Sequence, residues 1–194
     1  MRNGCVYFHF PALQIEEMKP SALLRLKDLS DEDYFQEVDS PMGKWVVGAG
    51  NKGIKWLKIV KDKAFTDRPN AITRKAVEQL DRYFTGDLHD FNLPLELDGY
   101  TNFSLRVWHE LIKIPYGNTI SYKTLAIRLG DVKCIRAAAR ANGSNPIPII
   151  IPCHRVIGSD GSLTGYALGL DVKKYLLELE NPTRFSTNQM ILFD

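Results

Sequence analysis

Three isoleucines, Ile149 to Ile151, followed at once by Pro-Cys-His-Arg, constrain this chain more than any other stretch. An uninterrupted apolar run of this kind predicts a strand that is buried on both faces. Proline fixes φ and lacks a backbone N–H, so Pro152 is expected to end that strand. Cys153, His154 and Arg155 then place a nucleophile, a base and a permanent cation beside the core. Packing gives no reason for such an ending, so the motif indicates a reactive site.

The first half of the chain predicts a small α/β domain. Turn residues at 40–43 and 50–53 separate short β-branched and aromatic segments, which is typical of an antiparallel β meander. Residues 70–87 then repeat apolar side chains at helical spacing, and Gly86 is expected to stop that helix. A polar stretch with proline and glycine follows, and we expect a domain boundary near residue 98.

The second half predicts mostly helices. Apolar spacing indicates one helix that ends before Pro115. Residues 121–130 and 131–142 predict two shorter helices, with Ser121 as the N-cap of the first and Gly130 just after its C-terminus. Two helices joined by a glycine-containing turn form a helix-turn-helix candidate, although many helical hairpins bind nothing.

The predicted fold class is therefore α+β: a small N-terminal α/β domain with an antiparallel meander and a mostly helical C-terminal domain. We expect four divisions of the chain. They are an N-terminal extension of no assigned role, the N-terminal α/β domain, the C-terminal domain with the helix-turn-helix and the cysteine, and a C-terminal tail: residues 1–34, 35–98, 99–181 and 182–194.

The second helix of the pair is thin and edged with arginine. Four of its residues are alanines, while Arg136 and Arg140 lie four positions apart and project from one face. Such a helix suits close approach to a duplex backbone or to the minor groove better than readout of base edges. Residues 101–170 carry eight Lys and Arg against three Asp and Glu, a net charge of +5 within a chain of +2. An Ala-rich core helix with two surface arginines explains the helix by itself equally well.

The cysteines and the apolar runs bear on the compartment. Cys5, Cys134 and Cys153 are odd in number and widely spaced, which fits no disulfide framework and suggests a reducing environment. No apolar run approaches the ~18 residues of a membrane span, and the N-terminus lacks the pattern of a signal peptide. We expect a cytoplasmic protein, or a nuclear one in a eukaryote, with no membrane partner.

From about Phe103 to Glu180 the sequence resembles the O6-alkylguanine-DNA alkyltransferase family, the suicide DNA-repair proteins. The family hallmark, Pro-Cys-His-Arg followed by two aliphatics, stands here as IPCHRVI. PYGNTISY, IRAAARANGSNP and GYALGLDVKKYLLELE match in the same order and spacing, and the meander from about residue 36 resembles the family's less distinctive N-terminal domain. The resemblance implies irreversible, single-turnover transfer of the alkyl group from O6-alkylguanine in duplex DNA to the chain's own cysteine. O4-alkylthymine is left open as a second substrate.

The resemblance also implies a role for each matching residue. Cys153 accepts the alkyl group, His154 activates it, and Glu180 orients the histidine. Tyr122 donates its hydroxyl as the guanine leaves, and Asn145 holds the turn ahead of the active-site strand. General chemistry agrees, because displacement needs a thiolate and a Cys–His pair with a third orienting group supplies one.

The implied partner is double-stranded DNA that contains alkylated bases. The target atom lies near the centre of the duplex, so the nucleotide must be flipped out, and Arg136 would enter the stack in its place. The implied contacts beside this finger are Ser121, Ala137, Ala138, Arg140 and Arg155. The implied base pocket is lined by Pro148, Tyr166 and Ala167. We expect a monomer and leave cooperative assembly on DNA open.

Adjacent side chains of an extended strand point to opposite faces, so Cys153 and His154 require a turn at Pro152. We expect that turn together with a bridging water. The chemistry requires no cofactor. Cys5, His9 and His89 are the only cysteine and histidine ligands available for a zinc before residue 100 and form no convincing set, so we expect no metal site.

Two other classes of protein remain as alternatives. A non-enzymatic sensor of DNA damage would keep the fold but lack the acceptor cysteine, and Cys153 argues against it. A cysteine hydrolase of unrelated fold would not explain the arginine-edged helix.

Three residues outside these alternatives carry expectations of their own. Glu178 is a second candidate beside Glu180 for the carboxylate that orients His154, and Cys134 is expected in the core. Leu168 replaces a glycine usual in the resembling family, which leaves the range of accepted alkyl groups open.

Overall fold

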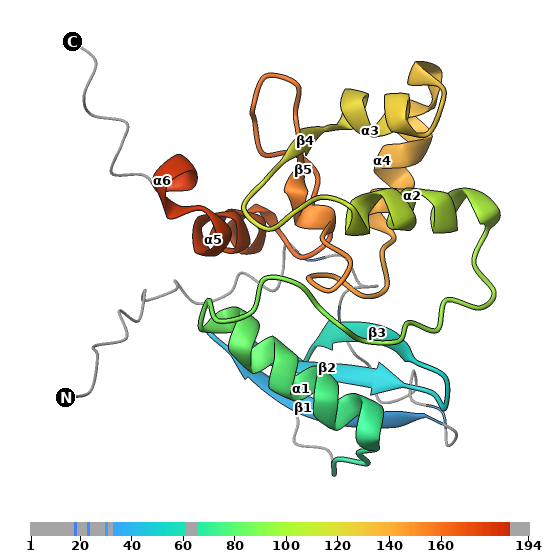
Figure 1. The fold of residues 1–194 in the computed structure, drawn as a ribbon, viewed down its shortest axis with the longest axis vertical. Coiled ribbons are helices and arrows are strands. Elements are labelled where there is room, and N and C mark those ends of the chain that lie inside the picture. The colour runs from blue at the N-terminus through green and yellow to red at the C-terminus, as the bar shows by residue number, and fades with distance from the viewer. Residues whose placement is uncertain (1–17, 19–22, 24–29, 31–32, 61–65, 187–194) are drawn as a thin grey trace.

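The computed structural model describes residues 18, 23, 30, 33–60 and 66–186 of the chain. An antiparallel sheet and one helix form the N-terminal half, and a group of shorter helices forms the C-terminal half (Figure 1). The two halves pack together, because a single cluster of buried apolar side chains contains residues of both. The predicted α+β class is therefore confirmed.

The sheet has the order β1-β2-β3 and is antiparallel throughout, as the meander prediction required. Ser40 pairs with Gly43 to close the first hairpin, and Gly43 adopts a φ of 99°, which glycine tolerates at no steric cost. The strands are β1 (Tyr34–Ser40), β2 (Gly43–Ala49) and β3 (Ile54–Ile59).

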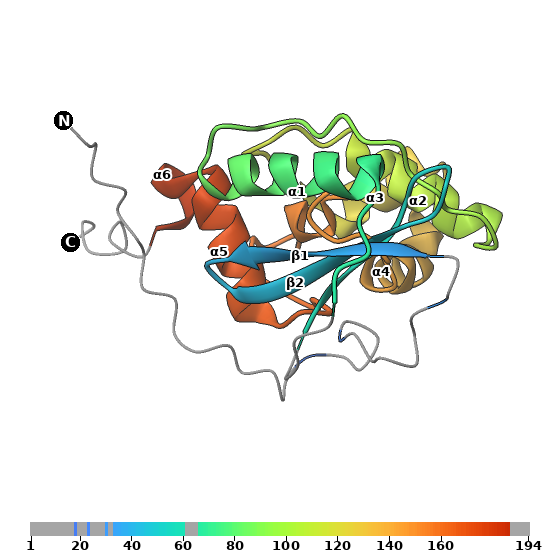
Figure 2. The same cartoon turned by 90° about the horizontal axis from the view of Figure 1, so that it is seen from below.

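Helix α1 (Ala71–Phe84) lies over one face of this sheet (Figure 2). It begins with a capping box, in which Asn70 accepts from the Thr73 amide while the Thr73 hydroxyl accepts from the Asn70 amide. Gly86, with a φ of 80°, follows its C-terminus as predicted. The last turn carries Tyr83, whose ring is fully buried between the two halves.

The C-terminal half contains the predicted helix-turn-helix. The Ser121 hydroxyl caps the first helix of the pair by accepting from the Thr124 amide, and Gly130 adopts a φ of 97° after its end. Two short strands pair in parallel and connect this hairpin to the cysteine segment. The elements are α2 (Asn102–Ile112), β4 (Ile120–Ser121), α3 (Tyr122–Arg128), the 3-10 helix η4 (Val132–Cys134), α4 (Ile135–Gly143), the 3-10 helix η5 (Cys153–Arg155), β5 (Val156–Ile157), α5 (Leu170–Glu180) and α6 (Pro182–Phe185).

The prediction of a buried strand at Ile149 to Ile151 is wrong. These residues are buried, but the chain turns there: Ile149 has a φ of 72°, and the Ile151 amide donates to the Ile147 carbonyl at 2.9 Å. Prolines at 146, 148 and 152 supply no backbone N–H, so the segment cannot build a strand ladder. A positive φ at a β-branched residue costs of order 1–3 kcal/mol, so the surroundings must hold this turn in place.

Only a few residues of the predicted N-terminal extension belong to the described part of the structure. Met18 is buried and Leu23 forms a β-bridge to Ile59, whereas the remaining residues before 33, except Ser30, lie outside the described part, including Cys5 and His9. The proposed division into domains stays a prediction. Among the described residues, no helix is both long and apolar enough to cross a bilayer.

Candidate active site

Cys153 begins η5 directly after Pro152, so the backbone turns where the sequence required a turn. Cys153 is buried, with 4% of the residue exposed, and His154 is completely buried. The Cys153 carbonyl accepts from the Asn142 side chain at 3.3 Å, which ties the C-terminal part of α4 to the cysteine. This bond fixes the Cys153 carbonyl against the end of α4.

Asn145 brackets the turn that precedes the cysteine. Its Oδ1 accepts from the Ile147 amide at 3.0 Å, and its Nδ2 donates to the Ile151 carbonyl at 2.7 Å. One side chain therefore satisfies backbone groups at both ends of the strained turn. This geometry is what the expected holding role of Asn145 requires.

The environment of the Cys153 sulfur has opposing effects on its pKa. Burial raises the pKa of the thiol, because a thiolate in a low-dielectric interior loses its hydration. The Asn145 side chain, the Tyr166 hydroxyl and the Lys173 ammonium each lower it in part. The Tyr166 hydroxyl is buried and has no other hydrogen-bond partner among the described residues, so it is available to the sulfur.

Lys173 is a site residue that the sequence interpretation missed. It is fully buried, and its ammonium donates to the Val156 carbonyl at 2.6 Å and to the Thr164 carbonyl at 2.9 Å. Burial lowers the pKa of Lys173 to about 8, while the cysteine opposes that shift. The signal was present in the helical pattern, because the buried face of α5 repeats at helical spacing: Val172, Lys173, Leu176, Leu177 and Glu180.

Glu180 is the hub of the site. Its Oε1 accepts from His154 Nε2, from Tyr83 Oη and from Arg155 Nη2, each at 2.8 Å. Its Oε2 accepts from Arg155 Nε at 2.9 Å and from the Gly117 amide at 3.1 Å. Burial raises the pKa of Glu180, but the imidazole and the guanidinium outweigh burial and hold it far below its usual range. The carboxylate is ionised.

His154 is the partner of this carboxylate. Burial lowers the pKa of the imidazole, and the raising effect of Glu180 offsets only part of that shift. The ring is therefore neutral near pH 7, with its proton on Nε2 toward Glu180. Nδ1 is then an acceptor, and within the described residues it has no hydrogen-bond partner.

Tyr122 stands at the start of α3 with its phenol facing the loop that precedes α5. Its hydroxyl donates to the Gly165 carbonyl at 3.3 Å and accepts from the Asn142 amide at 3.5 Å. Burial, followed by the charge of Cys153, raises the pKa of Tyr122 to about 12. The phenol therefore keeps its proton and is a hydrogen-bond donor at neutral pH.

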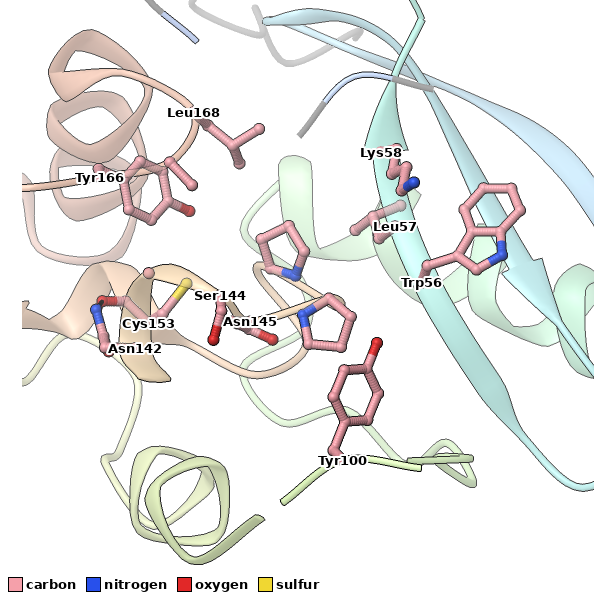
Figure 3. A pocket seen from close by; sticks show the side chains of 14 residues that line it. Trp56, Leu57, Lys58, Tyr100, Asn142, Ser144, Asn145, Cys153, Tyr166 and Leu168 are labelled. Atoms are coloured by element: carbon pink, nitrogen blue, oxygen red, sulfur yellow. Dashed lines mark hydrogen bonds between the residues drawn. The ribbon is translucent and has the colours of Figure 1, made fainter. Parts of the chain in front are cut away.

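A cavity of about 300 Å³ opens over the cysteine. In Figure 3 the sulfur points into it, with the Tyr166 ring above and the Asn145 side chain beside it. Pro148, Ala167 and Leu168 also line the wall, and β3 supplies the opposite side. The three residues expected to form the base pocket thus lie around one hollow. Leu168, whose effect on the accepted alkyl groups the sequence left open, is 2% exposed.

The residues expected to contact DNA separate into two groups. Arg136 and Arg140 are exposed on α4, and neither side chain has a hydrogen bond or ion pair in the described structure. Ser121 and Ala137 are half-buried, while Ala138 is fully buried beneath them. The thin helix therefore packs Ala138 and Ala141 into the core and leaves its two arginines in solvent, while its approach to a duplex stays a prediction.

The expectation that Arg155 contacts DNA is wrong. This side chain is 4% exposed, and its guanidinium binds Glu180 and donates to the Ile114 carbonyl at 2.6 Å. Its role is to neutralise the buried carboxylate.

Cys134 is half-buried rather than in the core, with its sulfur 4.0 Å from the Ala126 carbonyl. Within the described residues no group of three metal-ligating side chains is found, and the expectation of no metal stays a prediction because Cys5 and His9 are outside them.

Comparison with known proteins shows the family to which this chain belongs. The family model described as "6-O-methylguanine DNA methyltransferase, DNA binding domain" matches residues 102–182. A methylated-DNA–protein-cysteine methyltransferase of Methanosarcina barkeri is 46% identical over 153 residues, which cover 76% of this chain and 96% of that protein. This chain belongs to the methylated-DNA–protein-cysteine methyltransferase family. The resemblance inferred from the motifs is thereby confirmed.

Other members of the family agree. The Mycolicibacterium paratuberculosis member is 43% identical over 166 residues, which cover 82% of this chain and 98% of that protein. A crystal structure of Mycobacterium tuberculosis OGT in complex with DNA aligns with a TM-score of 0.67 and 41% identity, over 75% of this chain and 92% of that one. A crystal structure of the Mycobacterium tuberculosis O6-methylguanine methyltransferase aligns with a TM-score of 0.68 and 38% identity, over 84% of this chain and 99% of that one.

Proposed function

We propose that this chain repairs DNA by moving the alkyl group from O6 of guanine in duplex DNA to the sulfur of Cys153, once per molecule. The observation that carries this proposal is the position of that sulfur: it faces a cavity, lies beside the Tyr166 hydroxyl, and belongs to the residue directly before the buried His154 that pairs with Glu180, in a member of the methyltransferase family. In the reaction a C–S bond forms as the C–O6 bond breaks. The thiol loses one proton and the purine gains one, so no cofactor is needed.

His154 supports the loss of the thiol proton. The neutral ring presents Nδ1 as an acceptor, and a buried acceptor needs a donor. A water between Nδ1 and the thiol, as the sequence predicts, would carry the proton. Lys173, Asn145 and Tyr166 then lower the cost of the thiolate that burial otherwise penalises.

Tyr122 supports the departure of the purine. Displacement at the alkyl carbon leaves negative charge on the ring, and a donor aimed at that charge stabilises the transition state rather than bound substrate. The phenol of Tyr122 suits this role because its pKa of about 12 keeps it protonated. Tyr166, Ala167 and Pro148 would enclose the extruded base.

We propose α4 as the element that meets the duplex, within an acceptor domain of residues 99–181 that residues 35–98 support. Arg136 lies six residues before Asn142, which places it about 9 Å along the helix from the residue that touches the cysteine backbone. An exposed arginine less than two helical turns from that residue is suited to fill the stack as the base enters the cavity. Arg140 would contact the phosphate backbone, and the acting species would be a monomer on alkylated double-stranded DNA.

Replacing Arg136 with alanine is expected to slow repair of O6-methylguanine in duplex DNA by about 100-fold. Flipping a base costs a few kcal/mol, and each 1.4 kcal/mol corresponds to a factor of about ten in rate. Single-turnover rates should be measured on duplex and on single-stranded oligonucleotides. The loss should be much smaller on the single strand, where no stack must be refilled. Arg140→Ala is the matched control, with a smaller and equal loss on both; an equal loss for Arg136→Ala would contradict the finger role.

The proposal is tested by incubating the protein with an excess of duplex DNA that carries one O6-methylguanine per molecule. Loss of the lesion should stop after one equivalent per protein. Binding with no lesion loss would instead indicate a damage sensor. Continued turnover, or hydrolysis of an ester or amide without DNA, would indicate a hydrolase.

A further inference from the structure

We infer that Tyr83, which lies in the N-terminal half, is a positioning residue for the transfer reaction. Its hydroxyl shares Glu180 Oε1 with His154, and so it sets how strongly the carboxylate holds the imidazole. This inference rests on the proposed function, in which His154 receives the thiol proton.

The geometry places Tyr83 in direct contact with the relay. The Tyr83 hydroxyl donates to Glu180 Oε1 at 2.8 Å, the same distance as the His154 and Arg155 donors to that oxygen. The side chain is completely buried at the end of α1, 97 positions before its partner. The phenol is held by its neighbours, since its ring contacts Phe91 and Tyr116 at centroid distances of 5.4 and 6.1 Å. Among the described residues, Tyr83 is the one side chain of the N-terminal half that donates a hydrogen bond to the Glu180 carboxylate.

A carboxylate oxygen that three donors share is a weaker acceptor toward each of them. Without the Tyr83 hydroxyl, the charge on Oε1 would act more strongly on His154 and favour the imidazolium. A protonated His154 cannot accept the proton of the thiol. The hydroxyl therefore keeps the base neutral, and burial together with Glu180 raises the pKa of Tyr83, so that the phenol stays a donor at all working pH values.

Apart from His154 itself, Tyr83 is the only uncharged side chain among the described residues that donates a hydrogen bond to Glu180. Arg155 and Lys173 lower the pKa of the imidazole through their charge, and Glu180 raises it. Tyr116 points elsewhere, because its hydroxyl donates to the Leu179 carbonyl at 3.2 Å. The titratable and charged groups that face the His154–Glu180 pair are Tyr83 from α1, Tyr116 from the loop after α2, Arg155 from η5, Tyr166 from the loop before α5, and Lys173 from α5.

The test is Tyr83→Phe in the full chain, which removes one oxygen and keeps the buried ring. Single-turnover transfer rates on duplex DNA are measured between about pH 5 and pH 9. The acidic limb of the rate profile should move to higher pH by about one unit, so that the variant is about tenfold slower below the limb and matches the wild type above it. Tyr116→Phe is the matched control, because it removes a hydroxyl from the same cluster without touching the carboxylate, and its limb should stay in place.

A second readout needs no DNA. The chain has four histidines, so NMR of their ring nitrogens can follow His154 directly. Its titration should move upward in Tyr83→Phe and not in Tyr116→Phe. If the His154 titration and the acidic limb of the rate profile were both unchanged in Tyr83→Phe, the inference would be wrong. Tyr83 would then contribute only to packing, even if the variant were less stable. If the wild type transferred no methyl group the proposed function would fail, yet the titration would still decide the coupling.

Discussion

Cys153→Ser is expected to abolish methyl transfer, lowering the rate by at least about 10⁴-fold, while affinity for duplex DNA stays the same. The loss follows because removing an enzyme's nucleophile costs orders of magnitude that the remaining groups cannot restore, and because a serine hydroxyl does not ionise where a thiol can. Arg136 and Arg140, the proposed DNA contacts on α4, do not line the cavity that holds the sulfur, so the change leaves them untouched. Binding to lesion-bearing duplex and single-turnover repair should be measured on the same preparation.

Cys134 provides the matched control. It is a second free thiol, half-buried at the start of α4, and it lies outside the cavity. Cys134→Ser should repair at close to the wild-type rate. If transfer survived in Cys153→Ser and was lost in Cys134→Ser, the acceptor would be Cys134, which would contradict the account.

Glu180→Gln is expected to lower the free energy of unfolding by about 3–5 kcal/mol, the usual cost of breaking a buried ion pair. The substitution leaves the Arg155 guanidinium buried without its counter-charge, and it places an amide group against donors that require an acceptor. Transfer should slow as well, because His154 loses the group that orients it. Urea denaturation at neutral pH measures the change.

The pH dependence of that difference has a definite sign. The folded state holds the pKa of Glu180 below its ordinary value of 4.5, so the stabilisation is fully present above pH 4.5 and is lost as the pH falls below it. The gap between wild type and Glu180→Gln should therefore narrow in acid. Glu178→Gln is the control: this residue pairs with Lys174 at 3.8 Å near the surface, and its replacement should change stability by less than about 0.5 kcal/mol. Equal losses at the two positions would contradict a buried hub at Glu180.

Local patterns predicted most of the fold because each carries its own physical signal. The meander, α1 and the helix-turn-helix were readable from turn residues, caps and apolar spacing, and Ser121 and Gly130 serve as caps where expected. The isoleucine run misled because an apolar run reports burial and not conformation. The three prolines around it were the better signal, since they deny the backbone donors that a strand requires.

The site was predicted less completely, for a physical reason. Cys153, His154 and Glu180 follow from the motif and the resemblance; the structure pairs His154 with Glu180 at 2.8 Å, and Cys153 is the residue directly before that histidine. Arg155 was misassigned because a cation in the sequence gives no sign of whether it faces solvent or a buried carboxylate. Tyr83 joins the site only through tertiary packing across 97 positions, which no local pattern reports. Lys173 could have been found, because it falls on the buried face of α5.

The central claim is that one sulfur permanently takes the alkyl group. The most direct measurement is a peptide mass spectrum of the wild-type protein after reaction with an equimolar amount of duplex DNA that contains O6-methylguanine. The peptide that carries Cys153 should gain the mass of one CH₂ unit in nearly every molecule, and the DNA should lose the same unit. DNA that loses its methyl group while the Cys153 peptide keeps its original mass would contradict the account.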